Sequence, residues 1–307
     1  MQVTRATIIG YGSQAKAWAA NLKDSGLQVN LLLRPESPSI SQAKNEGLNV
    51  FTFEDELEQL GEIFVFLTPD DTHHLIAKEL SKKLNLNQKN FIYAHGYSYL
   101  RYDFEKTYPE VNHLLLAPKA IASELRERYL SQENLVAVLS DPKGKSSELL
   151  EVLSNKLGIT KKIQATFKDE TWADLFSEQS VLCSLLPYGA RKSFDFLIDK
   201  GIHPEVAFTE CWMEVKLIAD AMLKFGPEGF FKLISPNALI GGEKAQKLIF
   251  DNEYQKKLDS LWKDISSGQF DSQVDETKAN ELRQQVLDDW KKSKLPSVYD
   301  EFYKDQK

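Results

Sequence analysis

Two short segments of this sequence each carry a pair of carboxylates four residues apart. WADLFSEQ places Asp174 and Glu178 at this spacing, and TECWMEV places Glu210 and Glu214 at the same spacing. At this spacing the two side chains of a pair lie on one face of a helix. Both segments are rich in apolar residues, and an unpaired carboxylate is costly to bury. Because the neighbouring Lys216 offsets only one charge, the pattern requires a stronger positive partner.

A chain with few histidines and four such carboxylates favours a hard cation that prefers oxygen ligands. Mg²⁺, or Mn²⁺, suits these acids better than zinc does. Four acidic ligands can hold two such ions, and the ions would polarise a carbonyl and a hydroxyl of one substrate together. The alternative is two helices whose acids face solvent, because a chain with 45 acidic residues repeats this spacing by chance.

A second pattern, ATIIGYGSQAKAWAANLKDSG, reads as a strand, a glycine-containing turn and a helix, which is typical of a dinucleotide-binding start. Gly10 would make the tight turn, and Gly12 would let backbone N–H groups approach a pyrophosphate at the helix N-terminus. The candidate cofactor contacts in this turn are Gly10, Tyr11, Gly12, Ser13 and Gln14. The alternative is an ordinary turn in an α/β domain.

The segment QVNLLLRPESPSIS indicates which nicotinamide cofactor is bound. Its strand ends with Arg34, where an enzyme that binds the ribose hydroxyl of NAD would carry Asp or Glu. Arg34 with Ser37 and Ser39, or Ser41, suits a 2′-phosphate, so the sequence predicts NADPH in preference to NADH. In the alternative interpretation this is a solvated loop whose serines only begin a helix.

LTPDDTHH follows the next buried strand, where doubly wound enzymes place loops above the sheet. Thr68 and Pro69 are therefore candidate contacts at the cofactor edge. We expect His73 and His74 to be surface or capping residues rather than ligands.

These side chains must be positioned by two regions with different periodicity. Before about residue 160, short aliphatic runs alternate with amphipathic stretches and predict the strands ATIIG, QVNLLL, EIFVFL, NFIYAH, HLLLAP and LVAVLS. This order predicts a Rossmann-type, doubly wound, mostly parallel sheet. From about Thr166 only helical patterns follow. The predicted domains are residues 1–164, which bind the dinucleotide, and residues 165–307, which are all helical.

Composition narrows the class of partner. The 307 residues carry a formal net charge of -7 and no long basic run, which argues against nucleic acid and anionic membranes. No stretch approaches the roughly 18 apolar residues that cross a bilayer, and no signal-peptide pattern is present, so we expect a cytoplasmic protein. Cys183 and Cys211 are expected to be reduced core residues. The class of partner that remains is a small molecule.

Several of these motifs occur in one known family, and the sequence resembles short-form ketol-acid reductoisomerase. IGYGSQA is similar to the family's cofactor turn, and LLRPESPSIS to its phosphate-reading loop. AHGY would supply the family's histidine as His95, LLLAPK its lysine as Lys119, and LISPNALIGG its substrate serine as Ser235. The two acidic segments resemble its metal-binding helices, with the ligands Asp174, Glu178, Glu210 and Glu214.

The resemblance implies a reaction and its cofactors. Family members convert 2-acetolactate, or its ethyl homologue, into a 2,3-dihydroxy acid of branched-chain amino-acid synthesis by an alkyl shift and hydride transfer from NADPH. Two Mg²⁺ ions are implied. Asp174 would bridge them, Glu178 would help to hold one, and Glu210 and Glu214 would hold the other.

The remaining roles follow from the same resemblance. His95 and Lys119 would order water and carboxylates around the metals, Glu214 or a metal-bound water would move the proton that triggers migration, and Ser235 would hold the substrate carboxylate. In short-form members the partner subunit supplies the second acidic pair and the serine. The implied assembly is a homodimer with shared active sites and a knotted helical domain.

The chain departs from the family pattern at several places. Ala120–Ser123 replace the usual Gly-Pro-Gly-His after the lysine, and Ser184 and Leu185 replace two glycines. Pro187 should kink the helix there. Three alternatives therefore stay open: a paralogue that acts on another acetohydroxy acid, a simple 2-keto acid reductase, and a nucleotide-binding regulator without turnover.

Overall fold

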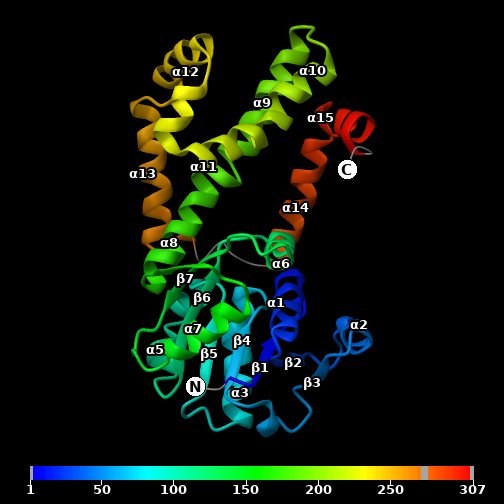
Figure 1. Cartoon of the computed structure of the whole chain (residues 1–307), viewed down its shortest axis with the longest axis vertical. Helices are drawn as coiled ribbons and strands as arrows, with labels where there is room; N and C mark the ends of the chain where they lie inside the picture. The colour runs from blue at the N-terminus through cyan, green and yellow to red at the C-terminus, as the bar shows by residue number, and fades with distance from the viewer. Residues whose placement is uncertain (1–2, 271–275, 305–307) are drawn as a thin grey trace. The chain divides into compact units, whose positions relative to one another are not determined.

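The computed structural model describes residues 3–270 and 276–304. The chain forms two compact units, Met1–Ala173 and Asp174–Lys307, which divide within one helix, α8 (Phe167–Ser177) (Figure 1). The boundary expected from the sequence, between residues 164 and 165, stays a prediction.

The first unit is built on an eight-stranded sheet with the order β3-β2-β1-β4-β5-β6-β7-β8. Every neighbouring pair is parallel except β6 and β7, which are antiparallel. The order reverses between β1 and β4, and the carboxyl ends of these two strands are where such a fold binds its ligand. The strands are β1 (Arg5–Ile9), β2 (Gln28–Leu33), β3 (Asn49–Thr52), β4 (Ile63–Phe66), β5 (Asn90–Tyr93), β6 (Asn112–Pro118), β7 (Val136–Ser140) and β8 (Lys161–Gln164).

Both faces of this sheet are covered, which is why its central strands are continuous apolar runs. In β1, Ile8 packs into the core on one face and Ile9 into the core on the other. Trp18, on the helix after β1, is fully buried in the first core, and Phe66 is buried in the second. The unit's helices are α1 (Ser13–Asp24), α2 (Ser39–Asn45), α3 (His73–Lys83), α4 (Tyr97–Arg101), α5 (Phe104–Thr107), α6 (Ala122–Ser131) and α7 (Ser147–Lys156), with 3-10 turns at Glu58–Leu60 and Asp70–Thr72.

The second unit is helical throughout its described residues, so the predicted fold class is confirmed. Its helices are the end of α8, α9 (Leu185–Asp199), α10 (Pro204–Phe208), α11 (Glu214–Leu233), α12 (Pro236–Ile249), α13 (Asn252–Ser266), α14 (Glu276–Trp290) and α15 (Leu295–Val298). Three segments are π-helical: Glu178–Leu182, Thr209–Met213 and Tyr299–Tyr303. The predicted knot stays a prediction.

The helix after Cys183 is interrupted, as the proline suggested, but the break lies before the proline. Ser184 leaves the helical conformation (φ -123°, ψ -81°), and α9 then starts with Pro187 in its first turn. Proline is tolerated there because the first N–H groups of a helix have no intrahelical partner. Helix α11 has a second break at Gly226 (φ 71°), directly before Pro227.

The second unit has a small core and a large exposed apolar surface. Its core holds Phe194, Ala207, Phe208, Leu295 and Val298. Many large apolar side chains elsewhere are exposed, among them Leu182, Leu186, Phe196, Leu217, Leu223, Phe231, Ile240 and Leu248. Cys183 is exposed and Cys211 is half-buried, so the prediction that both are core residues is wrong for the single chain. None of the described helices is long and apolar enough to cross a membrane.

Candidate metal and cofactor site

The turn after β1 requires glycine at its first position. Gly10 has a φ of 97°, and a Cβ there would lie 2.8 Å from Thr68 Cγ2 and 3.0 Å from the Leu67 carbonyl oxygen. The loops after β1 and β4 therefore touch, and only glycine lets them approach so closely. Gly10 was predicted to make this tight turn.

Gly12 caps α1, and the space beside it is open. A Cβ at Gly12 would meet nothing within 4 Å, and no side chain caps the helix there. The first N–H groups of α1, from Ser13 onward, thus face a space that can take an anion such as a pyrophosphate. Gln14 points elsewhere, because its Nε2 donates to the Ala120 carbonyl oxygen at 3.1 Å and so ties the turn to the loop after β6.

Tyr11 links the cofactor turn to α2. Its hydroxyl donates to the Glu46 carboxylate, which also accepts from Gln42 Nε2 at 2.8 Å. Lys16 Nζ donates to Gln42 Oε1 at 3.0 Å and lies over the Tyr11 ring. Burial, followed by the Glu46 hydrogen bond and charge, raises the pKa of Tyr11 well above its usual value. The phenol is therefore a neutral structural donor that fixes α2 against the turn.

The candidate 2′-phosphate residues share the loop between β2 and α2. Arg34 directly follows β2 and is exposed, and its carbonyl accepts from the Ser37 N–H at 3.0 Å. Ser39 begins α2, and its N–H donates to Ser37 Oγ at 3.4 Å. An arginine and two serines thus lie on the turn that leads into α2, and their side chains are of the kind that binds a phosphate. Glu36 is exposed beside them.

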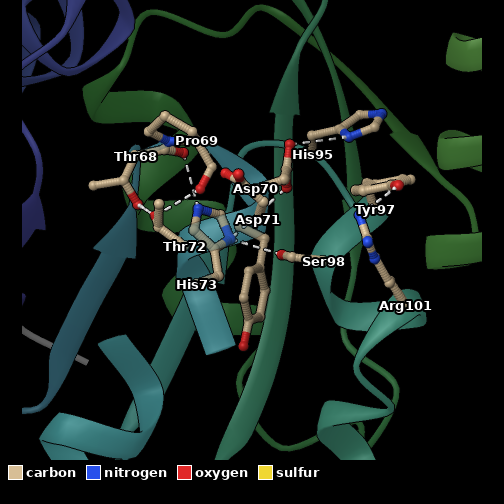
Figure 2. Close-up of polar contacts among 12 residues, drawn as sticks. Thr68, Pro69, Asp70, Asp71, Thr72, His73, His95, Tyr97, Ser98 and Arg101 are labelled. Carbon is tan, nitrogen blue, oxygen red and sulfur yellow. Dashed lines mark hydrogen bonds and ion pairs between the residues drawn. The ribbon is translucent and has the colours of Figure 1, made fainter. Parts of the chain in front are cut away.

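The loop after β4, with Thr68 and Pro69, is held by a buried histidine (Figure 2). His73 Nε2 lies 3.0 Å from the Thr68 carbonyl oxygen, and its Nδ1 lies 2.7 Å from Ser98 Oγ. The side chain is almost fully buried, and this burial lowers the pKa of His73. His73 is therefore not a surface residue, but it is the residue that caps the 3-10 turn Asp70–Thr72 at its C-terminal end, which was the other expected role. His74 is half-buried and stacks on the Tyr102 ring.

A buried glutamate that the sequence argument missed organises the site of the family histidine and lysine. Glu170, on α8, is 4 % exposed. Its Oε1 accepts from Lys119 Nζ at 2.6 Å, and its Oε2 accepts from the Gly96 N–H at 3.1 Å. Gly96 is required because a Cβ there would lie 2.3 Å from Thr171 Oγ1. The signal was present, since Glu170 precedes Asp174 by the same four residues that separate Asp174 from Glu178.

Three side chains in this region can share one cation. His95, Glu170 and Asp174 each offer a ligand atom, and these atoms lie within 4.8 Å of one another. Glu170 and Asp174 are one turn apart on the continuous helix α8. Two carboxylates and one imidazole form an oxygen-rich donor set that suits Mg²⁺ or Mn²⁺. Because Lys119 already neutralises Glu170, Asp174 is the better direct ligand.

The other predicted ligands lie beyond this group. Among the residues that the structure describes, the cation-competent group includes neither Glu178 nor the pair Glu210 and Glu214. Glu178 and Glu210 each fall in a π-helical segment, and both are exposed. Neither is buried in the single chain, and their role as metal ligands stays a prediction. Ser235 caps α12, and its hydroxyl accepts from the Ala238 N–H at 3.2 Å.

Comparisons with known proteins cover nearly the whole chain. Residues 1–162 match the family model described as acetohydroxy acid isomeroreductase, NADPH-binding domain, and residues 167–301 match ketol-acid reductoisomerase, C-terminal domain. Ketol-acid reductoisomerase (NADP(+)) of Methanocaldococcus jannaschii is 34% identical over 268 residues, which are 86% of this chain and 81% of that protein. Ketol-acid reductoisomerase (NAD(P)(+)) of Metallosphaera sedula is 32% identical over 275 residues, 88% and 82% respectively.

A solved structure agrees with these matches. The NADH-preferring ketol-acid reductoisomerase from an uncultured archean superposes with a TM-score of 0.84 at 28% identity, over 98% of this chain and 94% of that one. The fold, the open glycine turn and the acidic helix define a nicotinamide-dependent oxidoreductase of the Rossmann class with a helical second domain. Within that class, the chain belongs to the ketol-acid reductoisomerase family, which confirms the resemblance seen in its motifs.

Proposed function

We propose that this protein is a Mg²⁺-dependent, NADPH-oxidising ketol-acid reductoisomerase that acts on 2-acetolactate and its ethyl homologue. The observation that carries the proposal is the group formed by His95, Glu170 and Asp174, with Lys119 paired to Glu170, in a chain that matches both family domains. The two steps are an alkyl shift within the substrate and hydride transfer from the nicotinamide.

The donor set fits the implied metal. Asp174 belongs to the group that can hold a cation. The family resemblance implies that Glu178, with Glu210 and Glu214 of a second copy, would complete the sites for two Mg²⁺ ions. Bound there, the ions would polarise the carbonyl and the hydroxyl of the substrate. The side chain of Glu170 is fully buried between the Lys119 ammonium and the Gly96 N–H, so its charge is satisfied without a metal. We infer that Glu170 orients its neighbours and leaves Asp174 as the ligand.

The remaining roles in the reaction belong to side chains of the protein. Lys119 is held by Glu170 and presents N–H donors that orient water or a substrate oxygen. His95 offers an imidazole nitrogen to the same space. Glu214 or an ordered water accepts the proton that leaves before migration, and Ser235 binds the substrate carboxylate. Ser235 can do so while it caps α12, because a hydroxyl both donates and accepts.

The exposed apolar surface of the helical unit supports a homodimer. Leu223 is 86% exposed and Ile240 70% exposed, and comparable residues extend along α9, α11 and α12. Monomeric proteins rarely expose contiguous apolar surface on this scale. We infer that a second copy of this chain covers it, that the two helical domains form a knotted pair, and that the partner supplies Glu210, Glu214 and Ser235. We also expect the enzyme to be cytoplasmic and to bind neither nucleic acid nor membranes.

The test is an assay of NADPH oxidation with purified protein, Mg²⁺ and 2-acetolactate. Turnover that EDTA abolishes and Mg²⁺ restores is expected. Absence of turnover with 2-acetolactate and its homologue, in protein shown to bind metal, would refute the proposal. Reduction of 3-hydroxy-3-methyl-2-ketobutyrate alone would instead support a simple 2-keto acid reductase. The variant Glu214→Gln separates enzyme from regulator, because a regulator would keep its metal binding and nucleotide binding unchanged.

The cofactor preference has a separate test because the relatives are named for different nicotinamide cofactors. The Methanocaldococcus enzyme is named for NADP(+), the Metallosphaera enzyme for NAD(P)(+), and the structural neighbour prefers NADH. We expect NADPH here, because Arg34, Ser37 and Ser39 lie on the turn that leads into α2. The ratio of kcat/KM for NADPH to that for NADH should exceed one and fall in Arg34→Ala. A clear preference for NADH would contradict this assignment.

A further inference from the structure

The carboxylate of Asp70 lies between two histidines of different character (Figure 2). Its Oδ1 is 3.8 Å from His73 Nδ1, and its Oδ2 is 3.9 Å from His95 Nδ1. Oδ1 is buried and has no hydrogen-bond partner among the described residues. The Asp70 side chain is 31% exposed, but no hydrogen bond among the described residues offsets the charge on Oδ1, which therefore acts on the neighbouring imidazoles.

The tautomer of His73 is determined by its two hydrogen bonds. The Thr68 carbonyl oxygen can only accept, so the hydrogen of the neutral imidazole is on Nε2, 3.0 Å away. His73 Nδ1 then carries the lone pair and accepts from the Ser98 hydroxyl at 2.7 Å. His73 consequently turns no N–H toward Asp70. It joins the loop of Thr68–Asp71 to Ser98, three residues after His95, and so fixes the loop that carries Asp70.

His95 is the histidine on which Asp70 can act. A carboxylate 3.9 Å from Nδ1 favours the tautomer that turns an N–H toward it and disfavours the one that turns a lone pair toward it. We propose that Asp70 is a positioning residue that keeps His95 in the Nδ1–H tautomer, so that its Nε2 lone pair faces the cation or a water bound to it. Metal-binding histidines usually have such a carboxylate or carbonyl partner on the second nitrogen.

This inference rests on the proposed metal site, because it gives His95 a role toward the cation held with Asp174. It adds Asp70 as a second residue that positions the site, besides Glu170. Glu170 binds Lys119 and the Gly96 N–H, and so fixes the backbone directly after His95. Asp70 acts on the imidazole ring itself. The two carboxylates thus fix different parts of one loop: Glu170 fixes its backbone, and Asp70 fixes the ring of His95.

The tautomer can be read directly by nitrogen NMR of protein labelled with ¹⁵N-histidine. The chain has only five histidines, and the spectrum of His95→Asn identifies the His95 signals. In the unaltered protein we expect His95 to carry its hydrogen on Nδ1. In Asp70→Ala the signals should move toward the Nε2–H tautomer or a mixture. An unchanged Nδ1–H pattern in Asp70→Ala would overturn the proposal.

Metal affinity gives a second readout, measured with Mn²⁺ by electron paramagnetic resonance. Loss of a partner behind a metal-binding histidine typically weakens metal binding by about 10- to 100-fold, and we expect Asp70→Ala to fall in this range. NADPH affinity should be unchanged. Asp71→Ala is the matched control because it removes the same charge from the same 3-10 turn, and its Mn²⁺ affinity should match that of the unaltered protein.

The outcomes separate this inference from the proposed function. If the unaltered protein binds no Mn²⁺, the proposed metal site itself is refuted. If it binds Mn²⁺ and Asp70→Ala binds it equally well, only the role of Asp70 is refuted. An equal loss in Asp71→Ala would show a general charge effect and would also overturn the positioning role. Asp70→Asn, which keeps the size and an acceptor oxygen, should fall between Asp70→Ala and the unaltered protein.

Discussion

Replacement of Glu170 by glutamine tests whether the buried glutamate organises the site. Glutamine keeps the size of the side chain and can keep the hydrogen bond from the Gly96 N–H, which is 3.1 Å long. It removes the charge that faces Lys119 Nζ at 2.6 Å. The Glu170 side chain is fully buried, whereas that of Lys119 is 33% exposed, so water solvates part of the ammonium after the change.

The expected loss of stability follows from this asymmetry. Removal of one partner of a fully buried ion pair costs roughly 3–5 kcal/mol, and exposed pairs contribute about 1 kcal/mol or less. A pair with one buried and one partly exposed member lies between these limits, so Glu170→Gln should lose about 2–3 kcal/mol. For a unit of this size, such a loss lowers the Tm by roughly 5–10 °C.

A double-mutant cycle with Lys119→Met isolates the pair. The free energy of unfolding is measured by urea denaturation for the two single variants, the double variant and the unaltered chain. We expect an interaction energy of about 1–3 kcal/mol between the two positions. The exposed pair Lys216 and Asp220, 2.6 Å apart, is the comparison and should give about 0.5 kcal/mol or less. An equally small value for Glu170 and Lys119 would refute the reasoning.

Three further predictions concern other parts of the chain. Gly10→Ala should cost about 1–3 kcal/mol in urea unfolding and weaken NADPH binding in a fluorescence titration, because its Cβ meets Thr68 and φ is positive. Burial lowers the pKa of His113 to about 4 from 6.5, so the neutral ring stabilises the fold above pH 6.5, and up to about 3 kcal/mol is lost as the pH falls to 4. His113→Phe should flatten this dependence in urea unfolding across that range, whereas His203→Asn, at an exposed position, should not. Leu223→Asp should shift the protein from dimer to monomer in analytical ultracentrifugation, and an unchanged dimer would exclude this residue from the interface.

The fold was predictable where residues are buried on both sides. All six predicted strands form, because strands such as β4 (IFVF) are continuous apolar runs in the middle of the sheet. The two strands that the sequence argument missed are the edges, β3 (NVFT) and β8 (KKIQ). Each has four residues, none of which is buried, so neither shows the apolar pattern that identified the others. Their pairing is decided by their neighbours in the sheet, which local sequence does not record.

The site was less predictable because its contacts are long-range. Gly10 and its turn were evident from spacing alone. The pair of Lys119 with Glu170 joins residues 51 positions apart, and His73 reaches Ser98 across 25 positions. No local pattern marks His73 as buried, since it follows the polar residues Asp70–Thr72 and precedes a second histidine. Such residues become visible only when the sheet brings the ends of its strands together.

The apolar flanks of the helix that carries Glu210 and Glu214 predicted its burial at an interface with a partner subunit. In the single chain Leu217 and Met222 are more than half exposed, and Glu210 is exposed with them. If dimer formation covers this surface, it also removes water from the glutamates. The desolvation cost then arises on assembly, and a cation that offsets it must favour the dimer. Mg²⁺ should therefore lower the dimer dissociation constant, and Glu210→Gln should weaken that dependence.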